Sequence, residues 1–112
     1  MEKPRIRHIA LNVQDRDKTA EYYKKIFGLE EKTRGPSGTI YLSDGFVDVA
    51  LISTTKYPWG IHHFGFQVES VKGIEESAQT TAIANTRGAI AESWIQDVEG
   101  NRVDISEDGW PV

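Results

Sequence analysis

The chain has 112 residues, of which 38% are hydrophobic and 27% charged, and its formal net charge is −4. This size and composition predict a single domain over residues 1–112. The sequence has no apolar run long enough to cross a membrane and no apolar core of a secretory signal near its start, so we expect a cytoplasmic protein without a membrane partner. Lys and Arg are scattered singly, which argues against nucleic acid as a partner.

The first half of the chain predicts one strand, one helix and then three strands. Apolar residues alternate over residues 6–13, and Ala20, Tyr23, Ile26 and Phe27 then recur on one face of a helix that Gly28 is placed to end. Three more strands are expected at residues 29–32, 39–42 and 47–53, the last two joined by a turn at 43–45.

The second half repeats this order. Residues 61–68 match residues 6–13 at the offset of 55 positions that separates His8 from His63. A helix is expected from about Val71 to Ala84, and its glycine and threonines make it the weaker of the two helices. Strands follow near residues 84–86, at 91–95 and at 102–106, so the sequence predicts an α+β protein with a βαβββ module at about 4–54 and another at about 60–107.

The repeat places two histidines at equivalent positions. Strand alternation puts His8, Ala10 and Asn12 on one face of the first strand, and His63, Gly65 and Gln67 on the same face of its counterpart. By the same alternation we expect His62 to point to the opposite face.

An acid on a third strand completes a potential metal site. Val103 and Ile105 are apolar, which turns Asp104 to the side of the two histidines. Because the chain has no cysteine, a metal must bind to His and carboxylate groups. Two imidazoles and one carboxylate with open positions suit Fe, Ni, Mn or Zn as divalent ions, so we expect His8, His63 and Asp104 to be metal ligands.

The chain resembles the vicinal oxygen chelate superfamily, which includes glyoxalase I, methylmalonyl-CoA epimerase, extradiol dioxygenases and metal-free bleomycin-binding proteins. The resemblance rests on the opening strand at 5–11, on the helix and glycine turn at 17–29, on the second opening strand at 60–68 and on the closing hairpin at 97–107. It implies a cupped mixed sheet of two tandem modules, a small-molecule substrate and a homodimer.

The chain departs from the family pattern at two ligand positions. Family members usually carry Glu where this chain has Asp104. The fourth ligand of glyoxalases and epimerases falls on Ala50, or on Val49, and neither side chain binds metal. Asp48 lies on the Ala50 face, so it is a candidate fourth ligand or substrate-binding residue, and a solvent-exposed strand acid is its alternative interpretation.

Two aromatic residues, Tyr41 and Trp94, occupy corresponding places in the two modules, either as walls of a substrate pocket or as core residues. Three functions stay open. The first is a metal-dependent lyase, isomerase or dioxygenase whose small substrate is chelated through vicinal oxygens. The alternative is a metal-free binding or resistance protein of the bleomycin-binding type, or a regulatory protein that keeps the fold alone.

Overall fold

The computed structural model describes residues 4–85 and 92–108. Its helices are α1 (Arg16–Phe27) and α2 (Val71–Ala78). The strands are β1 (Arg5–Asn12), β2 (Glu30–Arg34), β3 (Ile40–Ser43), β4 (Asp48–Ile52), β5 (Gly60–Gln67), β6 (Ile83–Asn85), β7 (Glu92–Gln96) and β8 (Arg102–Ser106). The order β-α-β-β-β therefore occurs twice, as predicted. No helix of the described residues is long and apolar enough to cross a membrane.

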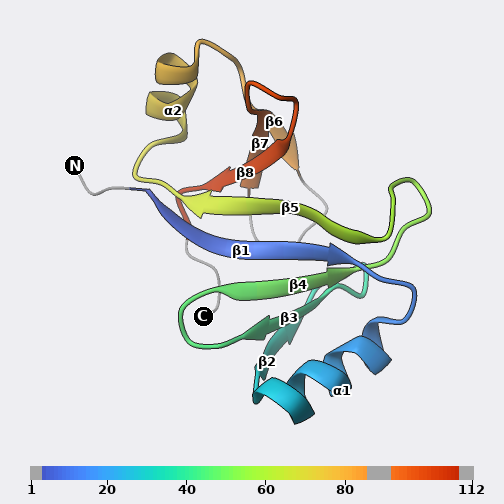
Figure 1. Cartoon of the computed structure of the whole chain (residues 1–112). Coiled ribbons are helices and arrows are strands. Elements are labelled where there is room, and N and C mark those ends of the chain that lie inside the picture. Colours follow the sequence, from blue (N-terminus) through green and yellow to red (C-terminus); the bar gives the residue numbers. More distant parts are fainter. Residues whose placement is uncertain (1–3, 86–91, 109–112) are drawn as a thin grey trace.

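All the strands belong to one mixed sheet with the order β2-β3-β4-β1-β5-β8-β7-β6. Each module contributes one parallel pair, β1 with β4 and β5 with β8, and the modules join through the antiparallel pair β1 and β5. Figure 1 shows the sheet curling away from β1 and β5, so that β2 at one end and β7 with β6 at the other lie behind them. The predicted cupped mixed sheet is confirmed, and the strands that carry the two histidines are neighbours at its centre.

The first module has a closed core on the convex face. Helix α1 begins after Asp15, whose side chain accepts a hydrogen bond from the Lys18 N–H, and it ends at Gly28 with φ 70°. Its buried Ala20 packs with residues of β3 and β4, namely Ile40, Leu42 and Leu51. Ile26 and Phe27, which the sequence places on one helical face with Ala20, remain 55% and 64% exposed. The helix contacts β2, β3 and β4.

The second helix is shorter than predicted, ending at Ala78 and not near Ala84. Gln79 adopts a left-handed conformation with φ 54°, and the two threonines that follow disfavour helix because their β-branched side chains are restricted there. The chain then forms β6. The end of the strand predicted near 84–86 and the start of the one predicted at 91–95 lie outside the described residues.

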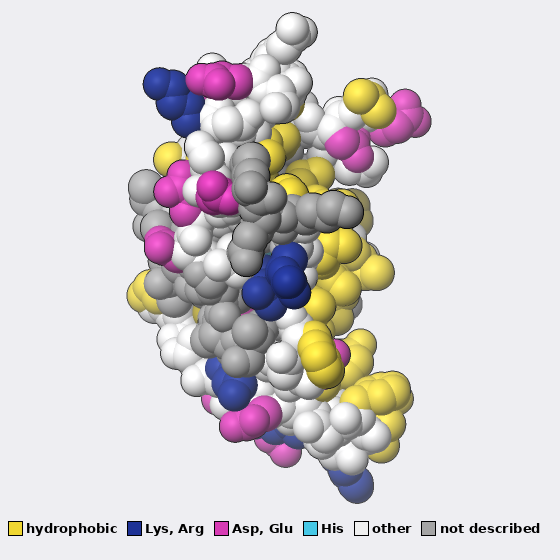
Figure 2. Space-filling model, turned by 90° about the vertical axis from the view of Figure 1, so that its left-hand side faces the viewer, with side chains coloured by type: hydrophobic (Ala, Val, Ile, Leu, Met, Phe, Trp, Pro, Cys, Tyr) yellow, Lys and Arg dark blue, Asp and Glu magenta, His cyan; other side chains and the backbone are white. Residues whose placement is uncertain are grey.

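The convex face of the second module is less well covered. Helix α2 buries none of its side chains, and the strand residues Phe64 and Phe66 on that face are only partly buried. Ile6 and Ile61 at the ends of the central strands are 48% and 78% exposed. Figure 2 shows hydrophobic side chains gathered along one edge of the molecule.

Candidate metal centre

The three predicted ligands converge on the concave face of the sheet, within one chain. His8 comes from β1, His63 from β5 and Asp104 from β8, and the strand register places His8 beside Gly65, which is in turn beside Asp104. Asp104 Oδ2 lies 3.1 Å from His63 Nε2 and 3.7 Å from His8 Nε2. One ligand atom of each residue lies within 4.8 Å of the other two. This spacing requires only a small closure to meet the distances between ligands of one ion.

The protonation states of His8 and Asp104 also fit a cation. Burial lowers the pKa of His8 to about 3, so its ring is neutral and its 3.7 Å contact with Asp104 is not an ion pair at neutral pH. Burial alone would raise the pKa of Asp104, but hydrogen bonds from His63 and Arg102 outweigh burial and hold that pKa below its usual value. Neutral imidazole and ionised carboxylate are the forms that bind metal.

Arg102 is a close partner of Asp104. Its Nε donates to Asp104 Oδ1 at 2.7 Å and its Nη2 donates to Oδ2 at 3.3 Å. The guanidinium also lies 5.3 Å from the centroid of the Trp94 ring. Both oxygens of Asp104 are therefore engaged by a cation that the chain itself supplies.

The prediction that His62 points away from the site is wrong. The register between β1 and β5 shifts between the pairs Ala10–His63 and Leu11–Ile61, which is a β-bulge at His62. The bulge brings His62 Nδ1 to 2.6 Å from His63 Nδ1. When an ion takes the place of the hydrogen bond from His63 Nε2 to Asp104, the His63 proton can lie on Nδ1 and be donated to His62, which leaves Nε2 free to bind the ion.

A cavity of about 450 Å³ opens beside the group. His63 and Arg102 line it, together with the two predicted aromatic residues Tyr41 and Trp94. The small residues Ala10 and Ala50 contribute to its wall. Because Ala50 holds the position equivalent to Asp104 in the other module, an alanine there widens the cavity where a fourth ligand would stand.

The structure does not bring Asp48 into this cavity. It lies beside His8 in the register of β1 and β4 and is fully buried, but it belongs neither to the three-residue group nor to the cavity wall. Burial raises the pKa of Asp48 to about 6, because its charged form loses water. The expectation of an exposed strand acid is therefore wrong, and a direct role at the cavity has no support from its position.

A carboxyl that sequence reasoning missed, Glu92, lines the cavity from β7. Burial raises the pKa of Glu92 to about 8, and the charge of the nearby Asp104 adds to this shift. Strand alternation gave a weak signal for it, because Glu92 is two residues before Trp94 and so shares the inward face.

A curled sheet of two βαβββ modules with polar residues gathered on its concave face defines the vicinal oxygen chelate class of proteins. The family model of the Glyoxalase/Bleomycin resistance protein/Dioxygenase superfamily matches residues 5–105, and the chain belongs to this superfamily. Among curated proteins, none matches the sequence.

Solved structures agree on the fold at low sequence identity. The 2,3-dioxygenase LapB from Pseudomonas sp. KL28 has a TM-score of 0.76 at 18% identity over 96% of this chain and 42% of that one. Methylmalonyl-CoA epimerase from Mycobacterium tuberculosis has a TM-score of 0.73 at 16% identity over 89% of this chain and 85% of that one. A glyoxalase/bleomycin resistance protein/dioxygenase superfamily member from Vibrio splendidus 12B01 has a TM-score of 0.64 at 19% identity, covering 92% and 97% of the two chains.

Proposed function

We propose that His8, His63 and Asp104 hold a divalent ion, Fe, Ni, Mn or Zn, and that the protein is a metal-dependent lyase, isomerase or dioxygenase acting on a small substrate with vicinal oxygens. The observation that carries this proposal is the convergence of one ligand atom from each of the three side chains within 4.8 Å, beside a cavity that His63 lines. When bound, a divalent ion polarises substrate oxygens and stabilises the negative charge that develops on them.

The described residues supply the remaining functions of such a site. Tyr41 and Trp94 provide apolar walls for the carbon skeleton of a substrate, and His62 fixes the orientation of the His63 ring through the contact between their Nδ1 atoms. Glu92 is the acidic side chain among the described residues of the cavity wall, and we assign it the transfer of a substrate proton at its carboxyl oxygens. This assignment favours an isomerase or a lyase, because both reactions move a proton.

Metal content measured after purification without chelator tests the proposal. Stoichiometric metal is expected in the wild type, and loss of most of it in His8→Ala and in His63→Ala. Circular dichroism of each variant serves as the folding control. Stoichiometric metal retained in both folded variants would overturn the proposal.

The role of Glu92 is tested separately by proton exchange. A panel of 2-hydroxyketones and acyl thioesters in D₂O, followed by NMR, is expected to reveal a compound whose α-proton exchanges in the presence of the metal-loaded protein. Glu92→Gln should keep the metal and lose the exchange. Exchange at the wild-type rate in this variant would remove Glu92 from the reaction.

A specific contact favours the second candidate, a metal-free binding protein of the bleomycin-binding type. The two-point contact of Arg102 with Asp104 neutralises that carboxylate without an ion. Binding of an aromatic ligand that is unchanged by EDTA, with no turnover, would support this candidate. Activity restored to EDTA-treated protein by a divalent ion would exclude it.

A homodimer remains part of the proposal. The partly exposed Phe64 and Phe66 and the exposed Ile61 leave apolar surface on the convex side, and the sheet ends in the edge strands β2 and β6. Light scattering at micromolar concentration is expected to give twice the chain mass. A strict monomer under these conditions would contradict the dimer.

A further inference from the structure

The cavity wall is cationic although the chain as a whole is acidic. The described lining residues include Arg16, Lys56 and Arg102 but a single acid, Glu92, in a chain with a formal net charge of −4. Arg102 is bound to Asp104. Among the described residues, neither Arg16 nor Lys56 forms an ion pair, whereas Lys24, Lys32 and Arg34 on the outer surface all do. Within residues 4–85 and 92–108, two cations at one cavity are therefore without an acidic partner.

Arg16 is held in place by the loop between β2 and β3. Its Nη1 donates to the Ser37 carbonyl oxygen at 3.1 Å. Gly38 has φ +92°, and a Cβ at that position would come within 2.7 Å of Arg16 Nη2. The guanidinium thus lies against a glycine that leaves room for it. Its one hydrogen bond to the described part of the chain leaves several of its five N–H donors for a ligand.

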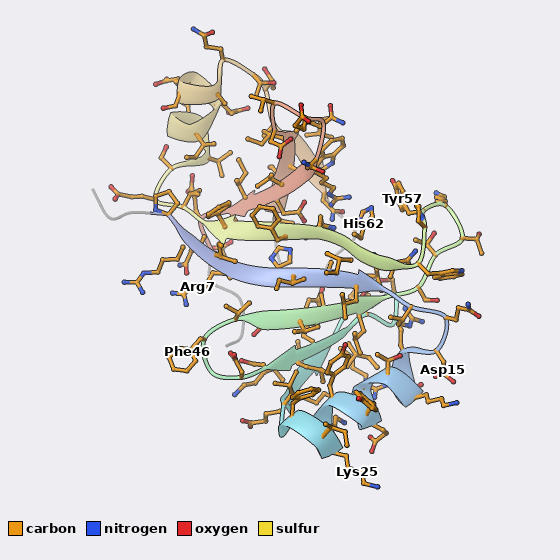
Figure 3. All side chains as sticks on the ribbon, viewed as in Figure 1. Arg7, Asp15, Lys25, Phe46, Tyr57 and His62 are labelled. Carbon is orange, nitrogen blue, oxygen red and sulfur yellow. The ribbon has the colours of Figure 1, made fainter. Side chains whose placement is uncertain are left out.

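Lys56 is carried by an anchored loop between β4 and β5. The buried side chain of Asn12 donates to the carbonyl oxygens of Thr54, Tyr57 and Pro58 and accepts a hydrogen bond from the Thr54 N–H. The Tyr57 ring lies 4.4 Å from the His62 ring, centroid to centroid. In Figure 3 Tyr57, His62 and Asp15 all lie at the end of the sheet where β1 finishes, and Asp15 directly precedes Arg16.

Three residues with hydroxyl groups, Ser37, Ser53 and Thr54, also line the cavity. A hydroxyl group can donate a hydrogen bond to an anion as well as accept one. Carboxylate and phosphate oxygens are acceptors only, and they bind most strongly to charged N–H donors. The two cations and the hydroxyl groups therefore favour an anion at this part of the cavity. These residues come from α1 and two loops, and none of them belongs to the proposed metal ligands on β1, β5 and β8.

We propose that Arg16 and Lys56 bind a carboxylate or phosphate on the substrate, and that the substrate class is therefore small compounds with vicinal oxygens at one end and an anionic group at the other. The volume of about 450 Å³ suits a molecule of that size. Binding of the vicinal oxygens rests on the proposed metal-dependent function. Binding of the anionic group rests on Arg16 and Lys56.

A matched pair of chelating probes tests this. Benzohydroxamic acid and 4-phosphonobenzohydroxamic acid share a metal-binding end with vicinal oxygens and differ in the phosphonate. Calorimetry on metal-loaded protein is expected to give at least tenfold tighter binding of the phosphonate compound, weakening with added salt. Arg16→Gln combined with Lys56→Gln should reduce the ratio to about one while the metal content stays unchanged. Lys25→Gln, a cation on the outer side of α1, is the control (Figure 3) and should keep the wild-type ratio.

Equal affinity of the wild type for both probes, or a preference that survives in the double variant, overturns the proposal. A second pair of probes distinguishes failure of the anion site from failure of the metal site. In EDTA-treated protein, benzylphosphonate is expected to bind more tightly than benzyl alcohol, and the double variant should lose the difference. Preference for benzylphosphonate in a protein that binds no metal would leave the anion site standing and remove the proposed enzymatic function.

Discussion

The imidazole of His8 occupies the space beside Gly65 that any other side chain at position 65 would fill. A Cβ on Gly65 would overlap the ring, reaching Cε1 and coming within 2.7 Å of Nδ1. His8 is only 1% exposed, so its ring has little room to move. The glycine of one module therefore sets the position of the histidine of the other.

Gly65→Ala is expected to displace His8 and to lower metal affinity at least tenfold, because the ligand atom leaves the convergent group. The affinity is measured by competition with a chromogenic chelator, and the unfolding temperature should also fall. Gly73→Ala is the control, since a Cβ there meets Ser70 at 3.4 Å, an ordinary contact, and alanine favours helix. Unchanged metal affinity in Gly65→Ala would show that His8 is not held by this contact.

His62→Phe should lower metal affinity about 10- to 100-fold without changing the ligands themselves. The variant removes the ring nitrogen that lies 2.6 Å from His63 Nδ1, so the His63 ring loses the partner that sets its tautomer and orientation. His62→Asn keeps an acceptor near the same place and should retain more of the affinity. Equal loss in both variants would indicate a packing role for His62.

Asp48→Asn should stabilise the protein above pH 6 and have little effect near pH 4. Burial raises the pKa of Asp48 from 3.8 to about 6, so the folded state holds the proton more tightly than the unfolded state does. Stability from this group is highest below pH 3.8, falls as the pH rises towards 6, and stays lower above it. Ionisation of Asp48 therefore lowers the free energy of unfolding above pH 6 by about 3 kcal/mol relative to its value below pH 3.8.

Thermal unfolding of wild type and Asp48→Asn at pH 4.5 and pH 8 checks this prediction. Asp44→Asn is the control, because Asp44 is exposed and hydrogen bonds from Val47 and Phe46 hold its pKa below the usual value. That variant should give no gain at pH 8. A gain for Asp48→Asn of the same size at both pH values would contradict a charge effect.

Removing the two helix caps should have different consequences. Asp15→Ala is expected to lower the free energy of unfolding by about 1 kcal/mol, because α1 buries Ala20 in the core and unfolds with it. Ser70→Ala should increase hydrogen exchange in α2 and leave global stability nearly unchanged, since α2 buries no side chain. Denaturant unfolding and amide exchange measured on both variants test the contrast, and equal global losses would contradict it.

Much of the fold was predictable because the repeat at an offset of 55 residues indicates two copies of one module. The alternation of side chains along a strand then indicates which of them face inward. The inward orientation of His8, His63 and Asp104 followed from that periodicity alone. The orientation of His62 could not be predicted in this way. A β-bulge changes which face the following side chains point to, and the hydrophobic alternation of the sequence does not reveal the bulge. The end of α2 was also missed, since an apolar pattern does not register the left-handed cap at Gln79.

By itself, the sequence determined the α+β repeat, the inward face of each central strand and the identity of the three convergent residues, because these depend on local periodicity. Only the tertiary structure decided that Arg102 engages Asp104, that Glu92 and Arg16 reach the cavity and that Asp48 does not line it. These relationships join residues on different strands, a helix and a loop, and their geometry is set by how the curled sheet brings distant segments together.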